Sequence, residues 1–322
     1  MKRPTVGMVS SYVNLRPSPA DWLWNQSPQP FGVWQQVQMQ AAAAQPDFLL
    51  LYQYDFPRPE QPRSLRARLR QRLHPPAPPP DPAAEFRGVP PERRIYLLRE
   101  PPLPEVLATN QANYAQAQQY CGYVSGPDDF APVPGYMPAI WYVSASFREL
   151  AEMPCPEKVK ACSWVTSGIS RTANHRQRLD FLRQLQAQGL AFDLYGRGLP
   201  DWAATAGPLI NKWHALAPYA YNLAIENYAG NDWYASEKLW DALLAWCLPI
   251  YYGGGAADKL LPPGCFLRLP SLDEKGLQYI QAVTATPDAW YEAQAAIAEA
   301  RQIILHQLNL LNWLSDYVAQ FS

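Results

Sequence analysis

Short apolar runs recur along the whole chain, and stretches with helical periodicity separate several of them. In the first half, a strand, a helix and a second strand are predicted in turn at residues 5–13, 33–44 and 48–52. The second half repeats this order at residues 161–166, 176–188 and 192–195. Strand–helix–strand units are typical of a parallel sheet that is covered by helices. Because 322 residues are enough for two such domains, we expect a two-domain α/β fold.

Further elements fill the remainder of each half. Two more strands are predicted in the first half, at residues 94–98 and 120–124. After residue 221 a strand, a helix, another strand and C-terminal helices are predicted at residues 222–227, 236–247, 248–253 and 288–322. From this pattern we place one domain at residues 1–155, a second at residues 156–300 and a C-terminal helix at residues 301–322.

A proline-rich insert, residues 57–91, interrupts the first domain. Within it, residues 63–74 form a basic stretch in which Leu65, Leu69 and Leu73 recur at helical spacing among arginines. One interpretation is a solvated surface helix whose leucines pack on the domain. The other is peripheral contact with an anionic membrane surface.

The composition excludes several classes of protein. Hydrophobic residues make up 48% of the chain and charged residues 17%, which favours a packed core over disorder. A formal net charge of −1 offers no basic face for nucleic acid. Five cysteines are an odd number and lack metal-ligand spacing, and no apolar run is long enough to span a bilayer. We therefore expect a cytoplasmic protein without a bound metal.

The most informative segment is residues 221–255, YNLAIENYAGNDWYASEKLWDALLAWCLPIYYGGG. Ser236 is a predicted N-cap, which places Glu237 and Lys238 in the first turn of a helix. The free N–H groups of that turn and the lysine suit a diphosphate, and the glutamate suits sugar or ribose hydroxyls. A simpler interpretation is that Glu237 only complements the helix dipole and Lys238 is solvated.

This segment resembles the donor-binding signature of family 10 of the glycosyltransferases, the α-1,3-fucosyltransferases. Members of that family typically read F-x-L-x-F-E-N, then Y-V-T-E-K, then an apolar helix and P-V/I-x-x-G. The matching residues here are Tyr221, Leu223, Ile225, Glu226, Asn227, Tyr234, Ala235, Ser236, Glu237, Lys238, Pro249, Ile250 and Gly253.

Two further matches lie upstream. Arg178, Phe181 and Leu185 reproduce the family's R-x-x-F-x-x-x-L helix, whose arginine the resemblance assigns to the donor diphosphate. The run RIYLLRE places Glu100 just past a strand, where the resembling enzymes have G-E and a catalytic glutamate. The chain departs from that pattern at Arg99, which stands where a small residue is usual.

The resemblance implies a GT-B-type fold, in which two Rossmann-like domains face a central cleft and C-terminal helices follow. It implies an inverting transfer of L-fucose from GDP-fucose to a hydroxyl of an oligosaccharide or glycoconjugate acceptor, with no metal required. Glu100 is then the general base, and Arg178 and Lys238 stabilise the departing GDP. The resemblance assigns donor positioning to Asn227, Tyr234 and Glu237. Two alternatives stay open: a transferase that uses another GDP-hexose, and a catalytically silent protein that binds a sugar nucleotide or a glycan.

Overall fold

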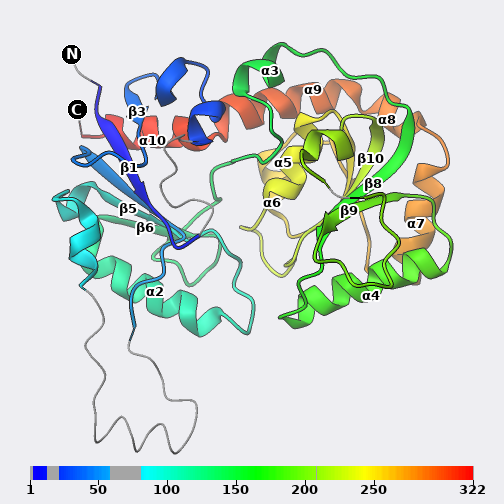
Figure 1. Cartoon of the computed structure of the whole chain (residues 1–322), viewed down its shortest axis with the longest axis horizontal. Coiled ribbons are helices and arrows are strands. Elements are labelled where there is room, and N and C mark those ends of the chain that lie inside the picture. Colours follow the sequence, from blue (N-terminus) through cyan, green and yellow to red (C-terminus); the bar gives the residue numbers. More distant parts are fainter. Residues whose placement is uncertain (1–2, 13–21, 59–80, 208, 322) are drawn as a thin grey trace, which may run out of the picture.

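The computed structural model describes residues 3–12, 22–58, 81–207 and 209–321. These residues form two domains, each built around a largely parallel sheet (Figure 1). The carboxyl ends of both sheets border a common central cavity. The prediction of two Rossmann-like α/β domains is therefore confirmed. The basic stretch 63–74, on which the membrane hypothesis depends, lies outside the described residues.

The first sheet has seven strands in the order β2-β3-β1-β4-β5-β6-β7. Their bounds are Thr5–Val9 (β1), Val33–Trp34 (β2), Val37–Met39 (β3), Phe48–Tyr52 (β4), Arg94–Leu97 (β5), Tyr123–Gly126 (β6) and Val133–Pro134 (β7). All neighbouring strands pair in parallel except β2 and β3. The apolar run of β4 is buried on both faces, because helices cover the sheet on both sides.

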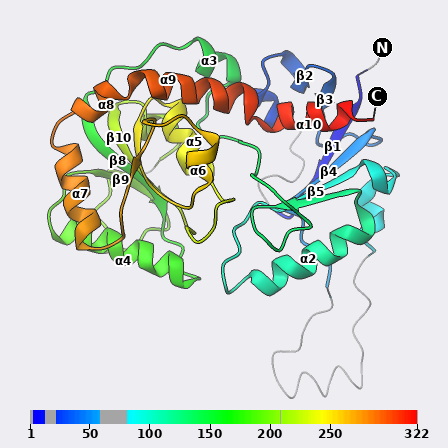
Figure 2. The ribbon, with the colours of Figure 1, turned by 180° about the vertical axis from the view of Figure 1, so that it is seen from behind.

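Two helices from distant parts of the chain cover these faces. Helix α2 (Leu107–Tyr120) packs through Tyr114 and Ala117 against the side of the sheet that carries Leu49 and Leu51. Helix α10 (Leu310–Ala319) covers the opposite side, as Figures 1 and 2 show from the front and from behind. The short helix α3 (Phe147–Glu152) follows before the chain enters the second domain.

The second sheet has five strands in the order β12-β11-β10-β8-β9, and all of them pair in parallel. Their bounds are Lys160–Ser167 (β8), Asp193–Arg197 (β9), Tyr219–Ile225 (β10), Leu248–Tyr252 (β11) and Leu267–Arg268 (β12). The helices of this domain are α4 (Ala173–Ala187), α5 (Glu237–Leu244), α6 (Ala256–Leu260), α7 (Glu274–Thr284), α8 (Asp288–Glu292) and α9 (Gln294–Gln302). The strand order reverses between β8 and β10, and open α/β sheets bind ligands at such a point.

Short helical turns connect several of these elements. Within the described ranges, 3-10 turns lie at Trp22–Gln26, Pro30–Gly32, Pro82–Phe86, Pro91–Arg93 and Lys212–Ala215. A π-helical turn, Ile303–Gln307, joins α9 to α10. The segment predicted as one or two helices is thus broken into several pieces, and its last piece crosses back to the first domain. There the Nδ2 of Asn309 donates to the carbonyl of Gln26 at 2.9 Å, and the Nε1 of Trp34 donates to Asn312 at 3.1 Å.

Two sequence-based predictions of secondary structure were wrong in the first domain. The predicted helix at 33–44 is instead the hairpin β2–β3, which turns at Gln35 with a φ of 45° and whose second strand pairs with β1. The pairing of Val37–Met39 with a buried strand outweighs the helical pattern. The predicted strand at 120–124 begins only at Tyr123, because Tyr120 ends α2. Helix α2 itself was missed, since its glutamines and alanines give no clear apolar periodicity.

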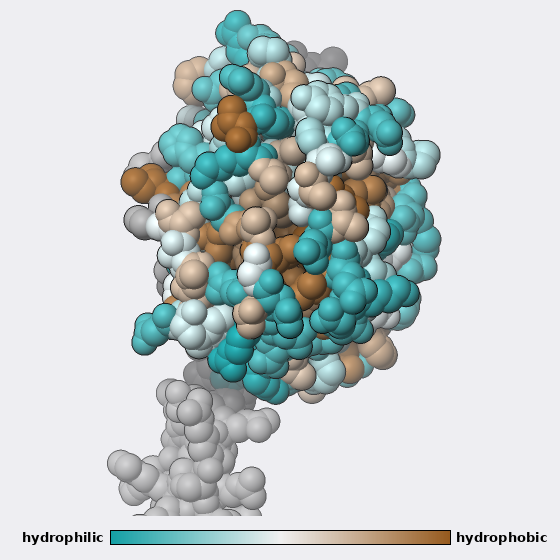
Figure 3. Space-filling view, turned by 90° about the vertical axis from the view of Figure 1, so that its right-hand side faces the viewer, coloured by the Kyte–Doolittle hydropathy of each residue, from teal (hydrophilic) through white to brown (hydrophobic). Residues whose placement is uncertain are grey.

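The surface adds little to the assignment of function. None of the described helices is both long and apolar enough to cross a membrane. Figure 3 shows the outer end of the second domain as a mostly hydrophilic surface with apolar side chains between the polar ones. All five cysteines carry free thiols, and four of them are buried.

Candidate active site

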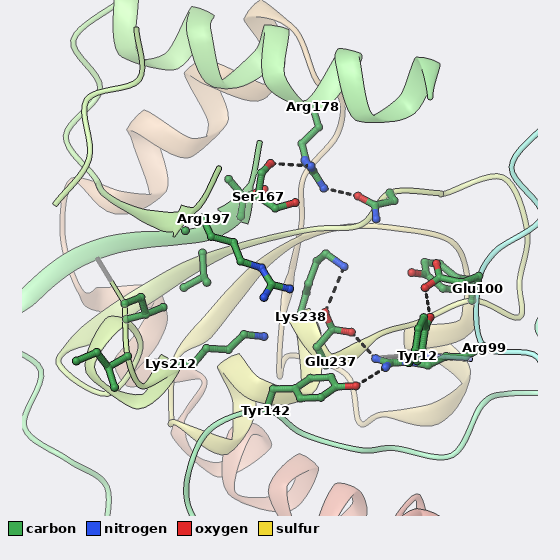
Figure 4. Close-up of a pocket in the computed structure, with 17 residues that line it drawn as sticks. Tyr12, Arg99, Glu100, Tyr142, Ser167, Arg178, Arg197, Lys212, Glu237 and Lys238 are labelled. Carbon is green, nitrogen blue, oxygen red and sulfur yellow. Dashed lines mark hydrogen bonds and ion pairs between the residues drawn. The ribbon is translucent and has the colours of Figure 1, made fainter. Parts of the chain in front are cut away.

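A cavity of about 730 Å³ lies between the two domains, at the carboxyl ends of their strands. The first domain contributes residues that follow β1 and β5, and the second contributes residues at the ends of β8, β9 and β10 and at the start of α5. All six site residues predicted from the sequence line this cavity: Glu100, Arg178, Asn227, Tyr234, Glu237 and Lys238. In Figure 4, Glu100 and Tyr12 of the first domain lie across the cavity from Arg178 and Arg197 of the second.

Glu100 lies three residues beyond β5 and is held by two neighbours. The backbone N–H groups of Arg99 and Glu100 donate to the Oε1 of Gln53, at 2.8 and 3.0 Å. The hydroxyl of Tyr12 donates to the Oε1 of Glu100. Burial and the Glu100 carboxylate raise the pKa of Tyr12, so the phenol stays protonated and remains a donor. The candidate base therefore has a fixed backbone and one oriented carboxylate oxygen.

Arg178 is placed by α4, which begins after the N-cap Thr172. Its side chain is 3% exposed. Nη1 donates to the Oδ1 of Asn227, and Nη2 donates to the carbonyl of Ser167 at 3.0 Å. Both acceptors are neutral, and burial lowers the pKa of the guanidinium, which nevertheless remains charged. Arg178 and Asn227 thus form one unit whose positive charge has no carboxylate partner among the described residues.

Lys238 forms an ion pair with a buried carboxylate, that of Glu226. The Glu226 side chain, which follows β10, accepts from the N–H and hydroxyl of Ser236 at 2.8 and 2.7 Å and from the Nζ of Lys238 at 3.2 Å. Burial opposes the charge on Lys238, but Glu226 and Glu237 outweigh it and raise the pKa of the lysine. The ammonium is therefore fixed and protonated at the cavity wall. Sequence reasoning placed Glu226 in a family motif but did not predict this anchoring role.

Glu237 differs from its expected state. Its Oε2 forms an ion pair with the Nη2 of Arg99 at 2.6 Å, and its Oε1 lies 3.7 Å from the Nζ of Lys238. Although burial disfavours the charged form, Lys238, Arg99 and Lys212 hold the pKa of Glu237 well below its usual range. We expected a carboxylate free to accept sugar hydroxyls, whereas one of its oxygens is occupied by a residue of the other domain.

A polar chain that sequence reasoning missed extends from this ion pair. The Nη1 of Arg99 donates to the hydroxyl of Tyr142 at 2.6 Å, and the backbone N–H of Tyr142 donates to the Oδ1 of Asp241 at 2.8 Å. The Oδ2 of Asp241 then pairs with the Nζ of Lys212 at 2.7 Å. Arg99 had been noted only as a departure from the family pattern, and nothing in the local sequence marks Tyr142 or Lys212.

Tyr234 is the last of the predicted residues that line the cavity. Tyr234 is 5% exposed at the cavity wall, and burial, followed by the charge of Glu226, raises the pKa of its hydroxyl well above the ordinary value. The phenol is therefore a neutral hydrogen-bonding group.

Across the described ranges, no cluster of three or more His, Cys, Asp or Glu side chains is arranged to hold a metal ion.

The second domain matches a known family of proteins in sequence. Residues 155–292 match the sequence profile described as "Glycosyltransferase family 10 (fucosyltransferase) C-term". The second domain is therefore similar to the C-terminal part of the family 10 glycosyltransferases. The match contains five of the six predicted site residues, and Glu100 lies outside it. The predicted resemblance to family 10 is confirmed over these residues.

Curated fucosyltransferases align with about a third of this chain. Human alpha-(1,3)-fucosyltransferase 4 is 33% identical over 119 residues, which cover 36% of this chain and 21% of the human protein. Mouse alpha-(1,3)-fucosyltransferase 7 is 35% identical over 121 residues, which cover 36% of this chain and 28% of the mouse protein. The chain therefore matches only about a quarter of the length of these relatives.

Solved structures of glycosyltransferases are similar to this chain in fold. Anabaena HepE in complex with UDP-glucose is 12% identical, with a TM-score of 0.51, and the match covers 99% of both chains. An alpha1,3-fucosyltransferase with GDP-fucose is 15% identical, with a TM-score of 0.42, over 91% of this chain and 81% of that one. The likeness to HepE over the whole chain supports the GT-B arrangement of two Rossmann-like domains.

Proposed function

We propose that this protein is an inverting glycosyltransferase that moves L-fucose from GDP-fucose to a hydroxyl of a glycan acceptor. One observation carries the proposal: a carboxylate of the first domain, Glu100, and two cations of the second, Arg178 and Lys238, line the same cavity. A group-transfer reaction with an anionic leaving group needs a base and a charge-stabilising group on either side of the reacting carbon. The family match and the fucosyltransferases named above support fucose as the sugar.

Glu100 is the proposed general base. The oxygen of the acceptor hydroxyl bonds to the anomeric carbon from the face opposite the phosphate, and its proton passes to the Glu100 carboxylate. Tyr12 already donates to Oε1 of that carboxylate, so the other oxygen is the proposed proton acceptor. The fixed backbone of Glu100 on Gln53 supports this role, because general bases act only within hydrogen-bond reach of the proton they remove.

Arg178 and Lys238 are the proposed leaving-group ligands. As the anomeric carbon–oxygen bond breaks, its electron pair stays on the GDP phosphate oxygen, where two fixed cations stabilise it. Each is held in place by the protein, Arg178 by Asn227 and Lys238 by Glu226. Cations that are oriented before the reaction need no costly rearrangement in the transition state.

Asn227, Tyr234 and Glu237 are proposed to position the donor. Glu237 and Tyr234 both line the cavity. The Oε1 of Glu237, which lies 3.7 Å from the Nζ of Lys238, and the neutral hydroxyl of Tyr234 suit sugar or ribose hydroxyls. Because Arg99 holds Oε2 of Glu237, we expect the donor to use Oε1 or to displace the arginine. A cytoplasmic location, and membrane contact through residues 63–74, stay predictions.

The proposal is tested by titrating the protein with GDP, UDP and ADP in a calorimeter, followed by donor hydrolysis with GDP-fucose and GDP-mannose. Selective binding of GDP with turnover of GDP-fucose would support it. Preferred turnover of GDP-mannose would point to another GDP-hexose, and GDP binding without turnover of either donor would indicate a silent binding protein. A protein that binds no GDP would refute the proposed donor.

A further inference from the structure

One cationic side chain of the cavity has no partner among the residues that the structure describes. Five cations line it, Arg99, Arg178, Arg197, Lys212 and Lys238. Three of these pair with carboxylates, and the fourth, Arg178, is held by neutral oxygens. The Arg197 side chain forms neither a hydrogen bond nor an ion pair with any residue that the structure describes. Arg178 and Arg197 are therefore two positive charges of the cavity that have no carboxylate within ion-pair distance in the part of the chain that the structure describes.

The backbone directs Arg197 towards the cavity. Arg197 is the last residue of β9, and its carbonyl accepts from the N–H of Gly168 at 3.1 Å, just beyond β8. Close approach of the two strand ends requires glycine on both: a Cβ at Gly196 would lie 1.7 Å from the carbonyl oxygen of Thr166, and a Cβ at Gly168 would lie 1.6 Å from that of Gly198. Gly196 also has a φ of 153°, which favours glycine. Arg197 therefore extends from a tightly packed strand end.

Figure 4 shows the guanidinium of Arg197 pointing into the same space as Lys238, Lys212 and Arg178. No carboxylate of the described residues lies within ion-pair distance of it. Neighbouring like charges repel each other, and an anion bound between them relieves this repulsion. An arginine fork also matches a phosphate with two parallel hydrogen bonds.

We propose that Arg197 is a phosphate ligand, which binds the diphosphate of the sugar nucleotide together with Arg178 and Lys238. The proposal rests on the proposed function for the identity of the nucleotide, but the chemistry that it requires is only a diphosphate. Arg197 is exposed at the cavity wall, and a bound nucleotide would cover it. Covering a charge pair from solvent strengthens it relative to a pair on an open surface. Because negative charge grows on the diphosphate as the sugar leaves, Arg197 also stabilises the leaving group.

The test compares the wild type with Arg197→Ala, Arg197→Lys and the control Arg183→Ala. Arg183 is an exposed arginine of the same domain that stacks on Trp202 and does not line the cavity. GDP and inorganic pyrophosphate are titrated against each protein. We expect Arg197→Ala to weaken both ligands by about tenfold to a hundredfold, Arg197→Lys to weaken them less, and Arg183→Ala to match the wild type.

Three results would overturn the assignment. In the first, Arg197→Ala binds both ligands as tightly as the wild type does. In the second, Arg197→Ala loses affinity for GDP alone, which would place Arg197 at the nucleoside. In the third, the wild type binds neither ligand. Repeating the titrations with UDP separates this proposal from the donor assignment. If UDP binds in place of GDP and its affinity depends on Arg197, the role of Arg197 as a phosphate ligand is supported and GDP-fucose as the donor is refuted. If GDP binds and Arg197→Ala leaves its affinity unchanged, only the proposed role of Arg197 is refuted.

Discussion

The Nη2 of Arg99 and the Oε2 of Glu237 lie 2.6 Å apart and join the two domains across the cavity. These residues are 138 positions apart in the chain, and their side chains are 13% and 19% exposed. Arg99 precedes the candidate base Glu100, and Glu237 precedes the candidate phosphate ligand Lys238. A single ion pair thus connects the backbone that carries the base to the helix that carries the leaving-group cation.

We expect this pair to contribute measurably to stability. In a double-mutant cycle of Arg99→Met and Glu237→Gln, the free energies of unfolding should show a coupling of about 1–3 kcal/mol, because each single change leaves a mostly buried charge without its partner. The exposed pair Arg148–Glu152, at 2.9 Å, is the matched control. Its cycle should give about 0.5 kcal/mol or less. Equal coupling in the two cycles would contradict the interdomain role.

The same pair makes stability depend on pH. The pKa of Glu237 is depressed in the folded protein, so its stabilising effect is fully present above the unfolded pKa of about 4.3 and is lost as pH falls below that value towards the folded pKa. Arg99→Met brings the folded pKa closer to the ordinary value. Urea unfolding from pH 7 to pH 3 should therefore show the stability gap between the wild type and Arg99→Met narrowing as pH falls. A constant gap would show that Arg99 does not set the charge state of Glu237.

Glu100→Gln tests the base. The amide keeps the size of the side chain but cannot take a proton, so we expect kcat to fall by about a hundredfold to ten-thousandfold, with GDP affinity within about twofold of the wild type. Donor and acceptor kinetics with parallel GDP titration measure both quantities. Glu92→Gln is the control, since Glu92 is exposed and lies outside the cavity. Turnover close to the wild type, or a large loss of GDP affinity, would refute the base assignment.

Lys238→Ala should have two separable effects. It removes a cation from the cavity, and it leaves the Glu226 carboxylate, which has no exposed surface, without its lysine partner. We expect GDP affinity to fall by about tenfold to a hundredfold and the free energy of unfolding to fall by about 1–3 kcal/mol. The double variant Lys238→Ala with Glu226→Gln should recover much of the stability and none of the affinity. If affinity returned along with stability, Lys238 would be only a structural partner of Glu226.

Part of this protein follows from short-range sequence pattern. The strands Phe48–Tyr52 and Leu248–Tyr252 and the helix after Ser236 were predicted within a few residues, because apolar runs and an N-cap act over neighbouring positions. Helix α2 and the β2–β3 hairpin were not predicted. The first depends on packing through Tyr114 and Ala117 rather than on periodicity, and the second depends on pairing with β1.

The sequence by itself determined two α/β domains and six of the residues that line the cavity. The residues that carry the family signature lie close together in the chain or recur at helical spacing. Only the tertiary structure decided which of them are paired. Tyr12 meets Glu100 across 88 positions, and Arg99 meets Glu237 across 138. Such contacts depend on how the strands are ordered and how the domains dock, and no local pattern records them. The charge state of Glu237 and the unpaired charge of Arg197 therefore became visible only in the folded chain.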